Sequence, residues 1–287
     1  MNRDEVRSIA RQAFDELVEA VEAGKSETLK EYLTAMGRFH RYSLGNAILI
    51  RLQKLGATHV AGFRAWQRLG RYVKKGEHGI AIMAPVVYRK NGLSKDRERS
   101  GEAERDIVST FKTAYVFDIS QTEGKPLPEF AQIQGNPESY LERLEQFVLA
   151  RGIELKRTEA LTMAEGLSTG GTILLKASLA QAEAFSVLVH EVAHELMHWD
   201  AEGQPKDRKI KETEAEAVAY VVCQGIGLDV TTASSDYIQL YDGDRKTLMN
   251  SLERIQRTAS EILEAITQDG GSGADVAGGM VNKAMAA

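Results

Sequence analysis

The stretch LVHEVAHELMHW, residues 188–199, places three of the chain's six histidines on one apolar segment with helical spacing. His190 and His194 are four residues apart, so a helix puts both imidazoles on one face, about 6 Å apart along its axis. The two rings can then share one metal ion, and Glu191, one step around the helix, can reach a water beside it. His198 lies about 12 Å from His190 along a straight helix, so we expect it outside the ligand set. The stretch therefore predicts a helix built around a metal site.

A third ligand is needed, because the pattern H-E-x-x-H arises by chance in about one per cent of chains of this composition. Glu212 begins the segment ETEAEAVAY, which follows a loop rich in Gly, Pro and Lys and can return antiparallel to the histidine helix. Two histidines and one glutamate leave a fourth position open, as a hydrolytic zinc site requires. We therefore predict Zn²⁺ bound by His190, His194 and a glutamate of this segment, with Glu212 as the first candidate.

Other side chains compete for the place of the third ligand. Asp200 would supply it in an H-E-x-x-H-x-x-G-x-x-D arrangement, but Met197 stands where that arrangement has glycine. Glu214 and Glu216 lie on the same acidic segment as the predicted ligand, and helix propensity cannot separate them from it. Cys223 lies downstream on an apolar helix face, which predicts an inert core thiol.

The chemistry expected of this site is hydrolysis of an amide bond. Zinc would lower the pKa of its water to about 7, and Glu191 would take the proton during attack on a carbonyl. Tyr237, in the segment SSDYIQLY, is assigned to the oxyanion from its residue type alone. The alternatives are a zinc ion with a purely structural role and a buried histidine row without metal.

The basic residues are concentrated in the first half of the chain. Twelve lysines and arginines lie between Arg38 and Lys95, where Glu77 is the only acidic residue, although the whole chain carries a formal net charge of −5. Such an asymmetry indicates a polyanionic partner.

Aromatic residues are interleaved with these basic ones: Phe39, Tyr42, Phe63, Trp66, Tyr72 and Tyr88. This combination suits single-stranded DNA, because basic side chains neutralise phosphates while exposed rings stack on unpaired bases. A solvated charged surface is the alternative, and the spacing of Phe63, Trp66 and Leu69 indicates that at least one of them anchors a short helix to the core. The predicted DNA-binding residues are Arg38, Arg41, Tyr42, Arg64, Trp66, Arg68, Arg71, Tyr72, Lys74 and Lys75.

The hydrophobic periodicity predicts an α+β protein in two domains. The first, residues 1–125, combines helices at 4–22, around 29–36 and from about 43 to 56 with a long β-hairpin of strands 79–89 and 109–120. Pro85 indicates an edge strand or a bulge in that hairpin.

The second predicted domain covers residues 126–268 and is zincin-like, with an HExxH helix and a returning glutamate helix. A proline-rich segment within 121–136 precedes it; it comprises a helix from Pro137 to Gly152, strands at 153–157 and 172–176, the histidine helix, and helices near 210–225 and 244–267. The tail, 269–287, is rich in small residues and is predicted to be flexible. One cysteine, no leader and no apolar run of spanning length indicate a cytoplasmic protein without membrane contact.

Two parts of the chain resemble known families. HEVAH followed by ETEAEAVA is similar to the signature of ImmA/IrrE type metallopeptidases, and this resemblance implies that Glu212 is the third ligand. YSLGNAILI, VAGFRAWQRLGRYVKKGEHGIAIMAPV and YVFDISQTEG resemble the single-stranded-DNA-binding domain of ArdC antirestriction proteins. The order of both parts resembles ArdC across about residues 5–267. Ala193 departs from the glycine that these families commonly place before the second histidine.

The resemblance to ArdC implies an antirestriction role, in which the protein protects incoming DNA from host nucleases. Two alternatives stay open. One is a regulatory metalloprotease that cleaves a DNA-bound repressor or nuclease and uses its first domain for targeting. The other is a DNA-binding protein with a vestigial zinc site.

Overall fold

The computed structural model describes residues 2–89, 107–126, 137–162, 164–199, 207–228, 240 and 244–267, and its class is mixed α+β, as predicted. The chain begins with the three predicted helices, α1 (Arg3–Glu22), α2 (Ser26–Arg38) and α3 (Leu44–Gln53). Leu17, Leu33 and Ile48 are buried on their apolar faces and pack into one hydrophobic core.

The predicted β-hairpin is confirmed. Strands β3 (Ile80–Arg89) and β4 (Ile107–Asp118) pair antiparallel, and β1 (Val60–Gly62) joins the other side of β4, so that β3 is an edge strand. Pro85 therefore lies on an edge strand, where its missing N–H removes no hydrogen bond from the interior of the sheet. The short helix α4 (Phe63–Arg68) follows β1, and a second small sheet pairs β2 (Arg71–Val73) with β5 (Thr122–Gly124) after the turn η1 (Ile119–Gln121).

Two side-chain amides of α3 cover the free edge of β3. Asn46 Nδ2 donates to the carbonyl of Met83 and its Oδ1 accepts the N–H of that residue, both at 2.9 Å. Gln53 makes the same two bonds to Ala81: its Nε2 donates to the carbonyl at 2.8 Å, and its Oε1 accepts the N–H at 2.9 Å. These amides take the place of a neighbouring strand, so the edge is not open to pairing with another chain.

The second half is built from helices around a small sheet. α5 (Pro137–Ala150) leads into β6 (Glu154–Thr158), which runs parallel to β8 (Thr172–Lys176), and β7 (Gly166–Ser168) pairs antiparallel with the other side of β8. Three helices follow: α6 (Gln181–Met197), α7 (Arg208–Gly225) and α8 (Arg245–Thr267). The strands β6 and β8 were predicted from the sequence, whereas β7 was not.

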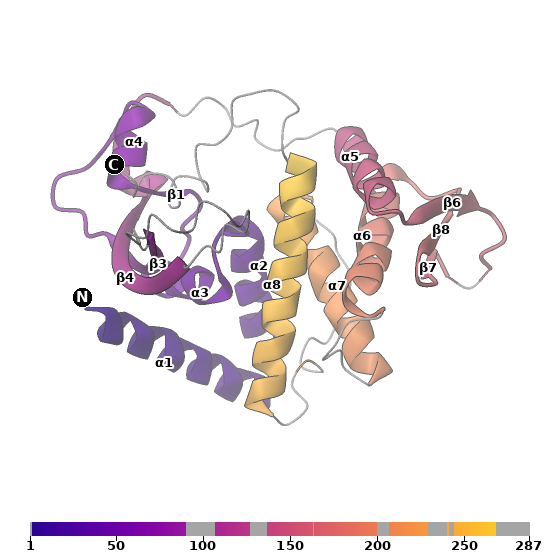
Figure 1. Cartoon of the computed structure of the whole chain (residues 1–287), viewed down its shortest axis with the longest axis horizontal. Helices are drawn as coiled ribbons and strands as arrows, with labels where there is room; N and C mark the ends of the chain where they lie inside the picture. The colour runs from indigo at the N-terminus through magenta and orange to yellow at the C-terminus, as the bar shows by residue number, and fades with distance from the viewer. Residues whose placement is uncertain are drawn as a thin grey trace, which may run out of the picture.

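One hydrophobic core joins the two halves. Figure 1 shows α8 crossing the centre of the molecule, between α1–α3 on one side and α5–α7 on the other. Phe14 of α1 and Val218 of α7 belong to the same buried cluster. At Gly37, α2 and α7 are so close that a β-carbon would lie 2.6 Å from the carbonyl oxygen of Val221. An isolated first half would therefore expose the apolar side of α2.

The predicted domain limits stay predictions, because residues 127–136 and the predicted tail lie outside the described residues. Among the helices that are described, none has the length and apolar character needed to cross a membrane.

Candidate metal centre and nucleic-acid surface

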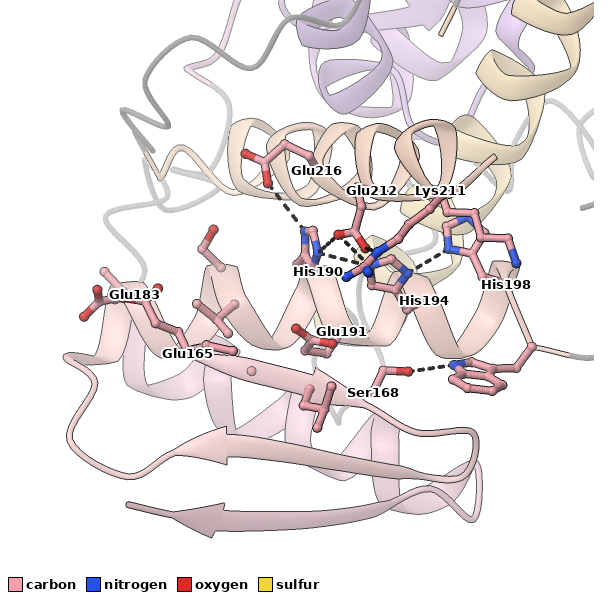
Figure 2. Close-up of a pocket in the computed structure, with 18 of the residues that line it drawn as sticks. Glu165, Ser168, Glu183, His190, Glu191, His194, His198, Lys211, Glu212 and Glu216 are labelled. Atoms are coloured by element: carbon pink, nitrogen blue, oxygen red, sulfur yellow. Dashed lines mark hydrogen bonds and ion pairs between the residues drawn. The ribbon is translucent and has the colours of Figure 1, made fainter. Parts of the chain in front are cut away.

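Three side chains from α6 and α7 converge on one point. His190 Nε2 and His194 Nε2 are 3.1 Å apart, and Glu212 Oε2 lies 3.6 and 3.5 Å from these two nitrogens. Figure 2 shows both imidazoles rising from α6 toward α7 and the carboxylate of Glu212 descending between them. The three atoms form a triangle at one wall of a cleft of about 950 Å³.

This triangle has the dimensions of a zinc site. Ligand atoms about 2.0–2.1 Å from a tetrahedral zinc ion lie about 3.3–3.4 Å from one another, close to the three distances observed. Two imidazole nitrogens with one carboxylate oxygen also suit zinc better than magnesium or calcium, which prefer oxygen ligands. The residues present therefore fit the metal that the sequence predicts.

The three side chains of the triangle shift one another's pKa values. The ion pair with His190 lowers the pKa of Glu212 to about 2. Burial acts to lower the pKa of His190, but the carboxylates of Glu212 and Glu216 outweigh it and raise this pKa to about 9. Burial and repulsion from His190 lower the pKa of His194 to about 4. Since a ligand imidazole must be neutral, a metal ion bound here would displace the proton of His190.

Glu191 lies outside the triangle, on the side of α6 that faces the sheet (Figure 2). Its side chain is buried yet lines the same cleft as the two histidines. Burial raises the pKa of Glu191, while His190 and the N–H of Ser168 partly offset that effect. A carboxylate whose pKa is raised toward neutrality is suited to accept and return a proton.

Strand β7 holds Glu191 in place. At Gly166 a β-carbon would lie 2.7 Å from both Cγ and Oε1 of Glu191, so this position has no room for a side chain. The turn after β7 is fixed to α6 by Glu195, whose carboxylate accepts from Ser168 Oγ at 2.7 Å and from the N–H groups of Gly170 and Gly171 at 2.9 and 2.7 Å. The Thr-Gly-Gly turn before a run of β-branched and apolar residues was the signal that could have predicted this hairpin.

The competing ligands occupy other places. Glu216 Oε2 lies 3.4 Å from Nδ1 of His190, the ring nitrogen that faces away from the triangle. Glu214 is fully buried beside His198, and Cys223 is also buried, with its pKa raised to about 12 by that burial. Asp200 and Tyr237 lie outside the described residues, so their predicted roles stay predictions.

Two residues predicted to bind DNA take part in packing: Trp66 is buried, and Tyr42 is half-buried. Trp66 is 2% exposed and its Nε1–H donates to the carbonyl of Phe117 at 2.8 Å. Its stacking on a base was therefore a wrong prediction, and it is the member of the Phe63, Trp66 and Leu69 set that anchors α4. Tyr42 donates its hydroxyl hydrogen to the carbonyl of Val60 at 3.3 Å, and burial raises its pKa to about 12.

The other predicted residues differ in what they offer a ligand. The guanidinium of Arg71 bridges β2 and β5, donating to Thr122 Oγ1 and to the carbonyls of Thr122 and Lys125. Its hydrogen bonds are therefore made within the protein. Lys74 donates to the carbonyl of Ser120 at 2.9 Å but stays exposed, and Arg41 is half-buried. The side chains that are exposed are Arg38, Arg64, Arg68, Tyr72, Lys74 and Lys75.

Residues 7–117 match the family described as the N-terminal domain of anti-restriction factor ArdC. The chain is ArdC-like. The match runs from within α1 to near the end of β4 and includes the basic segment Arg38–Lys95 and the β-hairpin.

Solved structures of ArdC have a similar fold over nearly the whole chain. The metal-free crystal structure of the antirestriction protein ArdC from plasmid R388 is 19% identical, with a TM-score of 0.52, and the alignment covers 90% of this chain and 97% of that one. The Mn(II)-bound crystal structure of the R388 protein is 16% identical, with a TM-score of 0.50 over 91% and 98% of the two chains. At these identities the likeness shows the fold.

A longer relative is also similar. An uncharacterized protein of Bacillus anthracis is 26% identical over 283 residues, which cover 84% of this chain and 48% of that protein. The ArdC-like chain thus spans about half the length of this curated relative.

The ArdC-like half also exposes aromatic rings outside the set predicted to bind DNA. Phe111 and Tyr115 were missed by sequence reasoning, whereas Phe63 was named among the interleaved aromatic residues. Phe63, Phe111 and Tyr115 are 48%, 45% and 44% exposed. Phe111, Tyr115 and Phe117 have the same parity along β4 and therefore lie on one face of the strand. The ring of Phe63 meets that of Phe117 edge-on, with centroids 6.3 Å apart. The alternation in FKTAYVF was the available signal for this face.

Proposed function

We propose that this ArdC-like chain is a single-stranded-DNA-binding protein with a hydrolytic zinc centre, and that it acts in antirestriction. Its likeness to the ArdC N-terminal domain supports the antirestriction role. The observation that supports the hydrolytic centre most strongly is the triangle of His190, His194 and Glu212 at the wall of a cleft that Glu191 also lines.

The residues of the cleft divide the work of hydrolysis. Zinc bound there would lower the pKa of a water molecule and would polarise a carbonyl oxygen. Glu191 accepts the proton of the attacking water at a carboxylate oxygen and returns it to the leaving amine. The Ser168 N–H orients that carboxylate, and the small residue at Gly166 leaves it space. Tyr237 is proposed to stabilise the oxyanion.

The DNA-binding surface is proposed to combine the exposed basic residues with exposed rings. Phosphate contacts are assigned to the exposed side chains Arg38, Arg64, Arg68, Lys74 and Lys75. Arg41 and Arg71 contribute less to phosphate binding, because both are partly buried. Tyr72, 56% exposed, is the predicted ring that stays available for stacking. Unpaired bases offer the π-faces that such rings need, so a single strand is preferred over a duplex.

The first prediction concerns the salt dependence of DNA binding. The whole chain, residues 1–287, should bind a single-stranded oligonucleotide in the presence of a chelator, because the proposed zinc ligands lie outside the basic segment. Its affinity should fall with salt on a log–log plot with a slope of about −3 to −4 for four to six phosphate contacts. Replacing Arg64, Arg68 and Lys75 together by Ala should flatten that slope by about 2, as measured by fluorescence anisotropy.

The control replaces three exposed lysines of the second half, Lys156, Lys209 and Lys246, by Ala and should leave the slope unchanged. Preference of the parent protein for duplex over single strand, or a slope near zero, would contradict the DNA-binding half of the proposal.

The second prediction separates a stacking ring from a core ring. Tyr72→Ala should weaken single-strand binding by about 1–3 kcal/mol without changing the salt slope or the stability. Trp66→Ala should instead lower the free energy of unfolding by about 3–5 kcal/mol, because it removes a buried ring. Unfolding in denaturant measures the effect of the Trp66 change. Unchanged DNA affinity in the Tyr72 variant would show that Tyr72 is not part of the DNA-binding surface.

A further inference from the structure

The third histidine of the stretch has a defined place beside the metal triangle. His198 follows the last residue of α6, and its side chain is 3% exposed. Its Nδ1 lies 2.9 Å from Nδ1 of His194, while its Nε2 lies 3.1 Å from Oε2 of Glu214. Figure 2 shows His198 on the side of His194 opposite His190.

Glu214 continues this contact into the core. Its side chain is 0% exposed, and its second oxygen, Oε1, is paired with the guanidinium of Arg254 on α8. Arg254 also donates to Ser251 Oγ at 3.2 Å. A buried carboxylate is costly unless hydrogen bonds and an opposite charge compensate it, and Glu214 has both. One line of contacting side chains therefore runs from the metal triangle to α8: His194, His198, Glu214 and Arg254.

The hydrogen bonds of this line have one consistent direction. Nε2 of His194 faces the triangle, so Nδ1 is the nitrogen that carries hydrogen and donates to Nδ1 of His198. Nε2 of His198 then carries the hydrogen that is donated to the carboxylate of Glu214. With these tautomers, His194 presents the lone pair of Nε2 to the triangle.

We propose that His198 and Glu214 are positioning residues of the metal centre, which hold His194 in the ring orientation and tautomer that direct Nε2 to the ion. The inference rests on the proposed zinc centre. Metal-bound histidines commonly donate their second N–H to a carboxylate, a carbonyl or water, and loss of such a partner weakens metal binding by about 10–100-fold. Here a second histidine stands between the ligand and the carboxylate, whereas His190 contacts Glu216 directly.

The test measures zinc affinity by competition with a chromophoric chelator. His198→Phe keeps a ring of similar size without nitrogens, and Glu214→Gln keeps the shape of the side chain without its charge. Each should weaken zinc binding by about 10–100-fold. The double variant should bind zinc within about twofold of the affinity of the weaker-binding single variant. His198 and Glu214 act on His194 through one another, so their effects should not add. Glu183→Gln, an exposed change on α6 in the same cleft, should leave the affinity unchanged.

Stability of the metal-free proteins separates positioning from folding. Thermal unfolding in chelator identifies variants that keep the fold, and a folded His198→Phe protein with the zinc affinity of the parent overturns the inference. If the parent itself binds no zinc, the proposed function fails instead.

A second measurement decides the matter if neither variant folds. Proton–nitrogen correlation spectra of the zinc-loaded parent with ¹⁵N-labelled histidine should show hydrogen on Nδ1 of His194 and on Nε2 of His198. Hydrogen on Nδ1 of His198, or on both of its nitrogens, overturns the inference.

Discussion

Glu191→Gln is expected to reduce peptide hydrolysis by about 10²–10⁴-fold while leaving the zinc content of the protein unchanged. Glu191 lies on the sheet side of α6, away from the triangle, so its loss removes no ligand. Glutamine has the same shape and can still accept the N–H of Ser168, but its amide cannot take a proton from water. The change therefore removes the base and keeps the site.

Cleavage of an unfolded protein such as casein, with and without single-stranded DNA, measures this effect on zinc-loaded protein. Glu183→Gln is the matched control, because it neutralises an exposed carboxylate of the same helix and cleft. Equal cleavage by the parent and the Glu191 variant would remove the assigned base. Absence of cleavage by the parent would favour a DNA-binding protein whose zinc has no catalytic role.

Glu212→Ala is expected to lower zinc affinity by orders of magnitude, because two imidazoles alone make a poor zinc site. Glu216→Ala should lose about 10–100-fold, since Glu216 contacts the far nitrogen of His190 and would act through that ring. Asp200→Ala should keep the affinity of the parent. Competition titration ranks the three variants on one scale.

Two outcomes of this series would change the account. Metal loss in the Asp200 variant would indicate that the third ligand lies at the end of the histidine helix. A larger loss of zinc affinity in the Glu216 variant than in the Glu212 variant would indicate that the register of α7 against α6 differs by one turn.

The histidine pair could be predicted from the sequence because the spacing of four residues acts within a single helix. The third ligand depends on how α7 lies against α6. Helical period alone places Glu212 and Glu216 on one face and Glu214 on another, so it could have set Glu214 apart. The choice between Glu212 and Glu216 follows from the register of the two helices, which the sequence does not state.

The aromatic residues show a different limit. Trp66 and Phe63 lie on the same short helix, with similar apolar character, yet one is buried and the other is 48% exposed. Their difference arises from contacts with β4, which is distant in sequence. Strand β7 was missed because it has only three residues, too few for a period, and its place is set by Glu195 and Glu191 of α6.

The joining of the halves also comes from long-range packing. Gln256 and Ser260 of α8 donate to the carbonyl of His40, at 3.3 and 2.5 Å, in the segment between α2 and α3. The same helix carries Arg254, which pairs with Glu214. Helix α8 therefore contacts the basic segment at His40 and also contacts Glu214, which His198 links to the metal triangle. Local sequence patterns do not contain this relation.

The most direct measurement of the metal centre is a crystal structure of the zinc-loaded protein with anomalous data collected at the zinc edge. The account predicts one zinc peak per chain, about 2.0–2.2 Å from Nε2 of His190, Nε2 of His194 and a carboxylate oxygen of Glu212. A peak bound by other residues, or no peak in the cleft of protein that had been loaded with zinc, would contradict it.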